Sequence, residues 1–291
     1  MLKQRLIAFL PVKGGIVVQS IDFERYLPVG KPQIAVEALN QWGIDEIILA
    51  DIEATPFGRC IDREMVRDVS KVCFVPLTVG GGIRSVAEMT DLIHSGADKI
   101  AINTAAVRTP ELVTQGAETF GSQCIVVSMD VRRNQNGQFE VFIHSGCEAT
   151  GVHPMELARR AERLGAGEVF LTSIDRDGSK IGYDLELAHA VAQSVRIPVI
   201  VCGGAGHPKH FYDGLKLPNV SAVAAGNYFH FSEHSATVTK SYLRKACPQN
   251  VRLDTYVDYR EFSYDDRGRI DRQTDEHLEK LFFEFHPREV I

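Results

Sequence analysis

Two similar segments of this 291-residue chain contain the residues best suited to proton chemistry. Asp130 lies in VVSMDVRR (126–133), and Pro11 holds the matching place in AFLPVKGG (8–15), about 120 residues earlier. Partial burial at the end of an apolar strand raises the pKa of a carboxyl group toward neutrality, where it can act as a general acid or base. Proline has no side-chain proton to exchange. The first segment therefore lacks the proton carrier that the second provides.

Two further carboxylates, Asp51 and Asp177, follow apolar runs in a similar way. At the mouth of a site they would orient a ribose-like hydroxyl group or assist a catalytic group. Aspartates at strand ends also cap the loops that follow them. The sequence leaves both roles open, and the capping role is open for Asp130 as well.

Two glycine-rich loops, VGGGIRS (79–85) and CGGAGHP (202–208), each lie between an apolar run and a helical pattern. Backbone N–H groups at such a helix start can surround a phosphate. The runs that follow, ending in INTA (102–105) and AAGN (224–227), supply further donors. A tight turn explains one such loop equally well, but two at related positions favour a ligand with a phosphate at each end. The predicted phosphate-binding residues are Gly81, Gly82, Asn103, Thr104, Gly203, Gly204, Gly226 and Asn227.

The elements that position these residues are short apolar, β-branched runs alternating with amphipathic helical patterns. Such alternation indicates a parallel sheet covered by helices, and eight units favour a closed (β/α)8 TIM barrel over an open sheet. In such barrels the active site lies at the carboxyl ends of the strands. The eight runs are RLIAFLPV, DEIILADI, VPLTVGGG, KIAINTA, CIVVSMDV, EVFLTSID, IPVIVCGG and VSAVAAG.

The two halves of the chain resemble each other at an offset of about 122 residues, as in DEIILADIEAT and GEVFLTSIDRDG. We therefore expect a two-fold half-barrel repeat, with two equivalent sites at one mouth. The barrel is predicted over residues 1–252 and a C-terminal extension over 253–291. The extension is polar, aromatic and acidic, and DEHLEKLFFEF (275–285) within it has a helical pattern. Packing of the extension on the barrel is favoured over binding to a partner.

Composition excludes several classes of function. A net charge of −6 argues against a nucleic-acid surface, and no apolar stretch reaches the length of a membrane span. The six cysteines are scattered, with no CxxC pair and no histidine at metal-ligand spacing. We therefore expect a cytoplasmic protein with reduced thiols, no metal and no organic cofactor.

Five motifs together resemble one known family: VGGGIRS, GADKIAINTAAV, TSIDRDGSKIGYD, GGAGHPKHF and NYFHF. From Met1 to about Leu253 the chain is similar to the cyclase subunit of imidazole glycerol phosphate synthase. The resemblance implies a barrel that takes ammonia from a glutaminase partner. At its mouth, that family uses ammonia on a bisphosphorylated ribonucleotide, giving imidazole glycerol phosphate and an aminoimidazole carboxamide ribotide.

The resemblance also implies roles for single residues, and the chain departs from some of them. The family uses two aspartates as general acid and base; Asp130 matches one, and Pro11 replaces the other. Gly14 and Gln19 stand where the family has an aspartate and a loop lysine. The catalytic loop is therefore changed, while the predicted phosphate-binding loops are kept.

At the opposite end of the barrel, the family has a ring of charged residues that gates an ammonia channel. All four members are matched here, although ordinary ion pairs at strand starts are the alternative interpretation. Asp98 matches a residue that contacts the glutaminase. The predicted gate residues are Arg5, Glu46, Lys99 and Glu168.

These observations favour a divergent paralog, similar to the cyclase-like proteins associated with amidation of bacterial surface sugars. Those proteins work beside a glutaminase-like subunit and a separate amidotransferase. One alternative is a genuine cyclase with an altered acid, in which Asp51 or Asp177 takes part. Another is a non-catalytic subunit that binds a phosphorylated ligand and activates a glutaminase.

Overall fold

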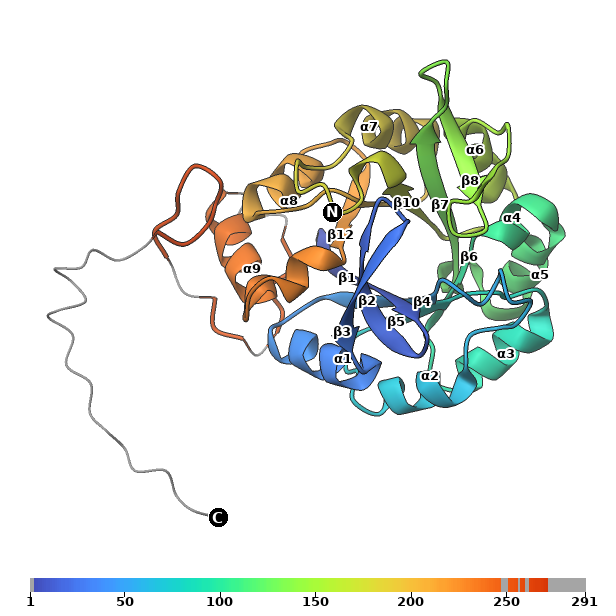
Figure 1. Cartoon of the computed structure of the whole chain (residues 1–291), viewed down its shortest axis with the longest axis horizontal. Coiled ribbons are helices and arrows are strands. Elements are labelled where there is room, and N and C mark those ends of the chain that lie inside the picture. Colours follow the sequence, from blue (N-terminus) through green and yellow to red (C-terminus); the bar gives the residue numbers. More distant parts are fainter. Residues whose placement is uncertain (1–2, 247–250, 256, 260–261, 272–291) are drawn as a thin grey trace, which may run out of the picture.

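In the computed structural model of this protein, eight parallel strands close into a barrel surrounded by helices (Figure 1). The structure describes residues 3–246, 251–255, 257–259 and 262–271. Parallel pairing of β12 with β1 and of β7 with β10 closes the barrel, so the predicted TIM barrel is confirmed. The barrel strands are β1 (Arg5–Lys13), β4 (Glu46–Asp51), β5 (Leu77–Gly80), β6 (Lys99–Ile102), β7 (Ile125–Arg133), β10 (Glu168–Ser173), β11 (Val199–Cys202) and β12 (Val220–Ala225).

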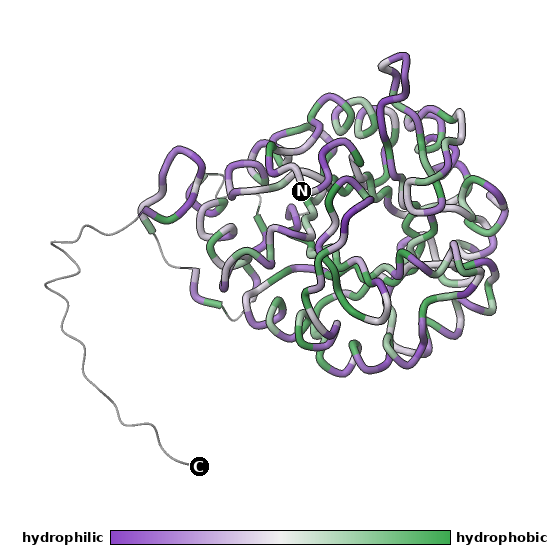
Figure 2. The backbone as a smooth tube through the Cα atoms, viewed as in Figure 1, coloured by the Kyte–Doolittle hydropathy of each residue, from purple (hydrophilic) through white to green (hydrophobic). Residues whose placement is uncertain are grey.

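Helices follow the strands and bury their apolar faces against the outside of the barrel. Side-chain caps fix some helix starts: Ser85 accepts from the backbone N–H of Glu88, and Asp184 accepts from that of Leu187. Figure 2 shows hydrophobic residues along the barrel strands. The helices are α1 (Pro32–Gln41), α2 (Arg63–Ser70), α3 (Val86–His94), α4 (Thr104–Arg108), α5 (Glu111–Phe120), α6 (Pro154–Arg163), α7 (Leu185–Ser194), α8 (Pro208–Leu215) and α9 (Ser235–Ala246).

Two barrel strands extend beyond the barrel into antiparallel hairpins at the mouth. β1 continues into β2 (Ile16–Ile21) and β3 (Arg25–Gly30), and β7 continues into β8 (Phe139–Ile143) and β9 (Glu148–Ala149). The expectation that Pro11 and Asp130 close their strands is therefore wrong, because β1 ends at Lys13 and β7 at Arg133. Pairing with a hairpin partner lengthens each strand beyond its apolar run.

The barrel interior is layered along its axis. Alternate residues of a strand face the same side, so β1 contributes Arg5, Ile7, Phe9 and Pro11 in turn from base to mouth. Ile7 belongs to a buried apolar cluster with residues of β4, β6, β7, β10, β11 and β12, and Phe9 packs against this cluster. Phe9 also contacts Phe170, with ring centroids 5.2 Å apart. An apolar layer thus separates the charged base from the mouth.

The described part of the C-terminal extension packs on the barrel. Val251 pairs with Gln4 at the base, and the Tyr259 hydroxyl donates to the carbonyl of Gly43 (3.4 Å). Further along, the carbonyl of Arg267 accepts from the Lys209 N–H at 3.0 Å. The helical pattern expected at 275–285 lies outside the described residues. Within the described ranges, no helix is both long and apolar enough to cross a membrane.

Candidate active site at the barrel mouth

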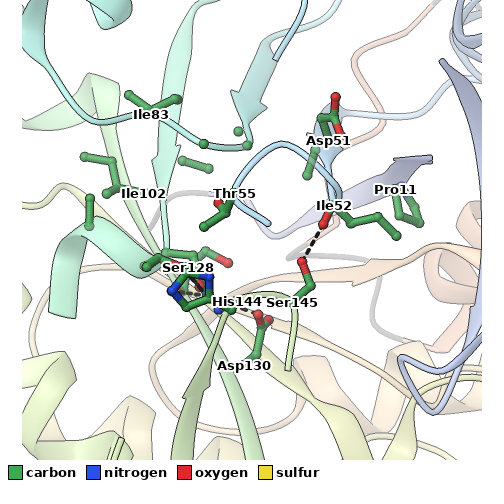
Figure 3. A pocket seen from close by; sticks show the side chains of 18 of the residues that line it. Pro11, Asp51, Ile52, Thr55, Ile83, Ile102, Ser128, Asp130, His144 and Ser145 are labelled. Atoms are coloured by element: carbon green, nitrogen blue, oxygen red, sulfur yellow. Dashed lines mark hydrogen bonds between the residues drawn. The ribbon is translucent and has the colours of Figure 1, made fainter. Parts of the chain in front are cut away.

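The barrel mouth holds a cavity with two unequal lobes, which share Phe9, Pro11 and Ser20. The first lobe has a volume of about 320 Å³ and the second about 30 Å³. The predicted mouth residues all line these lobes. Those of the first lobe are Asp51, Gly81, Gly82, Asn103, Thr104 and Asp130, and those of the second are Asp177, Gly203, Gly204, Gly226 and Asn227. Figure 3 shows Asp130 and Pro11 at different sides of the first lobe.

Asp130 is the carboxylate best placed for proton transfer. Burial, followed by the charge of Asp177, raises the pKa of Asp130 to about 7. The side-chain amide of Asn103 donates to its Oδ2 at 3.0 Å and partly opposes that rise. A group with this pKa is divided between its acid and base forms at neutral pH, as general acid–base catalysis requires.

Asp51 is held by neighbouring groups. Arg59 forms an ion pair with it, and the backbone N–H of Glu53 donates to its Oδ1 at 3.0 Å. Its carboxylate therefore has a structural task at the rim of the first lobe. Arg59 was missed by sequence reasoning, because it lies in an irregular loop eight residues after Asp51, with no motif to mark it.

Asp177 follows the 3-10 turn Ile174–Arg176 rather than ending β10 directly. Its Oδ2 accepts from the Ser20 hydroxyl at 2.6 Å and from the Phe23 N–H at 3.2 Å. Burial raises the pKa of Asp177 to about 6, although these two hydrogen bonds favour the charged form. Asp177 is thus bound to the β2–β3 hairpin. The hairpin contacts were also missed, because no apolar periodicity places that segment at the mouth.

The two glycine loops repeat the same packing. Gly81 has φ of +122°, and a side chain there would meet the carbonyl oxygen of Asp51. Gly203 has φ of +97°, and its side chain would meet the carbonyl oxygen of Ser173. Positive φ and close backbone approach both require glycine. The half-barrel repeat is therefore present in the loops, and these glycines have a structural reason independent of any ligand.

The polar side chains predicted to bind phosphate contact protein groups in this structure. Asn103 binds Asp130, and the Thr104 hydroxyl accepts from the His144 N–H at 3.2 Å. Asn227 binds the backbone of Ser20. A phosphate would therefore be held chiefly by backbone N–H groups of the loops.

The four predicted gate residues form one closed ring at the base of the barrel. Arg5 pairs with Glu46 (2.8 Å) and Glu168 (2.7 Å), and Lys99 pairs with the same two carboxylates at 3.2 and 2.8 Å. These side chains are only 6% to 16% exposed. Burial alone would raise the pKa of Glu168, but Arg5 and Lys99 outweigh it, so that pKa lies below its ordinary value. The ring spans the barrel axis opposite the mouth.

Asp98 lies next to this ring, just before β6. Its side chain is exposed, and its Oδ2 accepts from the backbone N–H of Leu77 at 2.8 Å. It thus helps to position the starts of β5 and β6.

Over the described part of the chain, no group of three or more histidine, cysteine or carboxylate side chains is arranged to hold a metal ion.

Comparison with known proteins agrees with this geometry. Residues 5–235 match the family model described as "Histidine biosynthesis protein". The chain is 44% identical, over 246 residues, to the imidazole glycerol phosphate synthase subunit HisF of Clostridium botulinum (strain 657 / Type Ba4). That match covers 84% of this chain and 97% of the relative. The resemblance expected from the five motifs is therefore confirmed: this protein belongs to the histidine biosynthesis protein family and, within it, to the HisF family of cyclase subunits of imidazole glycerol phosphate synthase.

Proposed function

We propose that this protein is the ammonia-using barrel subunit of a glutamine-dependent assembly, working as a divergent paralog in the amidation of a bacterial sugar. Ammonia from a glutaminase partner enters through the base ring, next to Asp98. It reacts at the mouth with a phosphorylated substrate held by the glycine loops, and Asp130 moves the proton. Asp51 and Asp177 position neighbouring groups.

One observation carries this proposal: Pro11 and Asp130 line one cavity, and only Asp130 can exchange a proton. Among the carboxylates described at the mouth, Asp51 is paired with Arg59, and Asp177 is bound to the hairpin. This arrangement does not provide the two free carboxylates that a mechanism with a separate general acid and general base needs. Chemistry with one acid/base group fits it.

Pro11→Asp alone is expected not to restore the cyclase reaction. The new carboxylate would lie in the shared part of the cavity, but the first loop still has Gly14 and Gln19 in place of the family's aspartate and lysine. The measurement is imidazole glycerol phosphate formation from the cyclase substrate at saturating ammonium. Full recovery of turnover by this single change would contradict the proposal.

Glu168→Gln is expected to uncouple the base ring from the mouth. The change keeps the shape of the side chain but leaves Arg5 and Lys99 to share Glu46. With glutamine and the glutaminase partner, amidation should fall at least about tenfold, whereas the rate with added ammonium salt should change less than about twofold.

Glu118→Gln, at an exposed position on α5, is the matched control and should affect neither rate. Equal losses with glutamine and with ammonium would show that the ring supports the fold and does not pass ammonia.

A second candidate is the cyclase subunit of imidazole glycerol phosphate synthase itself, which the 44% identity to the HisF relative favours. A third is a non-catalytic subunit that binds a phosphorylated ligand and activates the glutaminase. Loss of product at unchanged glutaminase activation after Asp130→Asn would exclude the third.

A further inference from the structure

We propose that the first lobe of the mouth binds the diphosphate group of a phosphorylated ligand, with one phosphate in the glycine loop and the other between Arg84 and Arg108. The ligand is therefore a diphosphate ester, with its terminal phosphate at the rim of the lobe. This inference deepens the proposed function and rests on it only in taking a phosphorylated compound as ligand.

The two lobes differ in the charged residues that line them. Among the described residues, three arginines and two aspartates line the first lobe, whereas one lysine and one aspartate line the second. Arg59 is paired with the buried Asp51. Because burial raises the pKa of Asp130 to about 7, this aspartate is only partly charged at neutral pH. The charge available to an anionic ligand therefore comes chiefly from Arg84 and Arg108.

Arg84 directly follows the first glycine loop, and the second loop has no charge at the matching place. Gly81 and Gly203 occupy equivalent turns, and three residues after them stand Arg84 and Gly206. A Cβ atom at Gly206 would lie 2.6 Å from the Cβ of Lys180, which is closer than carbon atoms pack. The turn therefore forms in the second half without a charged side chain, and its shape does not require Arg84.

Arg108 also belongs to a repeated element. Asn103 (φ −107°, ψ −85°) and Gly226 (φ −98°, ψ −80°) have nearly the same backbone conformation, and each precedes a short helical segment. Five residues after them stand Arg108 and Phe231. Phe231 is 41% exposed, so the second half has an apolar side chain at this place. The positive charge is again found only at the first lobe.

Both arginines make contacts that a ligand can replace. Arg84 donates to the Gly58 carbonyl at 2.8 Å and to the Glu88 carboxylate at 3.1 Å. Arg108 forms an ion pair with Glu148. Both arginine side chains are 58% exposed, and exposed ion pairs contribute little to stability. A ligand phosphate can therefore take the place of either carboxylate.

The number of guanidinium groups favours a second phosphate over a carboxylate. Backbone N–H groups of the glycine loop are enough to hold one phosphate. Each guanidinium group binds two acceptor oxygens side by side. A carboxylate has two oxygens and satisfies one arginine, whereas a terminal phosphate has three and can contact both. The first lobe, at about 320 Å³, lies within the usual range of ligand pockets, roughly 300–1,000 Å³.

The test is calorimetric titration of the full chain with inorganic phosphate, inorganic pyrophosphate and phosphonoacetate, which has a carboxylate beside its phosphonate group. The wild-type chain should bind pyrophosphate at least about tenfold tighter than phosphate and at least about fivefold tighter than phosphonoacetate. Equal affinity for pyrophosphate and phosphate would overturn the inference. Tighter binding of phosphonoacetate than of pyrophosphate would also overturn it, because the second anionic group would then be a carboxylate.

The double variant Arg84→Gln/Arg108→Gln locates the site. Glutamine keeps a polar side chain without the charge, so the ratio of pyrophosphate to phosphate affinity should fall to within about twofold. Arg63→Gln is the matched control, because Arg63 on α2 is 59% exposed and pairs with Asp91 at 2.8 Å; it should keep the wild-type ratio. A double variant with the wild-type ratio would show that these arginines do not hold the second phosphate.

Lys180→Gln tests the second lobe, which Lys180 lines. The ratio should stay unchanged, and a fall as large as in the double variant would place pyrophosphate in the second lobe and overturn the inference. If neither phosphate nor pyrophosphate binds, the phosphorylated ligand of the proposed function fails together with the diphosphate site. If pyrophosphate binds as expected but no nitrogen is transferred to a product, the amidation role fails and the diphosphate site stands.

Discussion

Asp130→Asn is expected to lower the rate of nitrogen transfer to product by about 10²- to 10⁴-fold, the usual contribution of a general acid–base group. Asparagine preserves the size of the side chain and can still bind Asn103, but it carries no exchangeable acid proton at neutral pH. Since the pKa of Asp130 is raised to about 7 by burial and by Asp177, wild-type activity should also titrate there. A general base works deprotonated, so the rate should rise as pH increases through about 7.

The measurement follows ¹⁵N from the amide of labelled glutamine into product, in the complex with the glutaminase partner. Glutamate release in the same reaction reports partner activation, which should survive in Asp130→Asn. Asp68→Asn, at an exposed position on α2, serves as the control. A variant with near wild-type transfer and an unchanged pH profile would remove Asp130 from the chemistry.

Lys240→Met should destabilise the fold by about 3–5 kcal/mol, because it leaves a buried carboxylate without its main counter-charge. Lys240 and Asp45 form an ion pair of 2.6 Å, and both side chains are fully buried. Asp45 also accepts from the backbone N–H of Leu6 at 2.8 Å, which ties α9 to the first barrel strand. Denaturant unfolding of the purified chain measures the loss.

Lys71→Met provides the matched control. Lys71 pairs with Asp68 at a similar distance of 2.7 Å, but both side chains are at least half exposed, so its loss should cost less than about 1 kcal/mol. The double variant Lys240→Met/Asp45→Asn should recover part of the stability, since the unpaired charge is gone. Equal losses of stability in Lys240→Met and Lys71→Met would show that burial of the Lys240–Asp45 pair has no special effect on stability.

The barrel could be predicted from the sequence, because the residue pattern that specifies each strand is local and recurs along the chain. Each barrel strand is an apolar run of a few residues, and the 122-residue offset relates Gly81 and Gly203, which occupy equivalent turns in the structure. The candidate site followed from the rule that strand ends meet at one mouth. Asp130, Asn103 and Thr104 were predicted in this way, and all three line the first lobe.

What sequence could not provide were contacts between segments that are distant along the chain. The ion pair of Arg59 with Asp51, the binding of Ser20 to Asn227, and the unequal lobes depend on loop conformation. The hairpin strands were missed because their apolar alternation is short. The end of β1 was placed too early for the same reason.

The loss of cyclase activity through Pro11 is tested most directly with the purified chain, without any glutaminase. The chain is mixed with the bisphosphorylated ribonucleotide of the cyclase family at high ammonium concentration, and imidazole glycerol phosphate is measured. Because Pro11 replaces the second acid/base group, no imidazole glycerol phosphate should form above background. Clear, enzyme-dependent formation of imidazole glycerol phosphate would contradict it and establish the protein as a histidine-pathway cyclase.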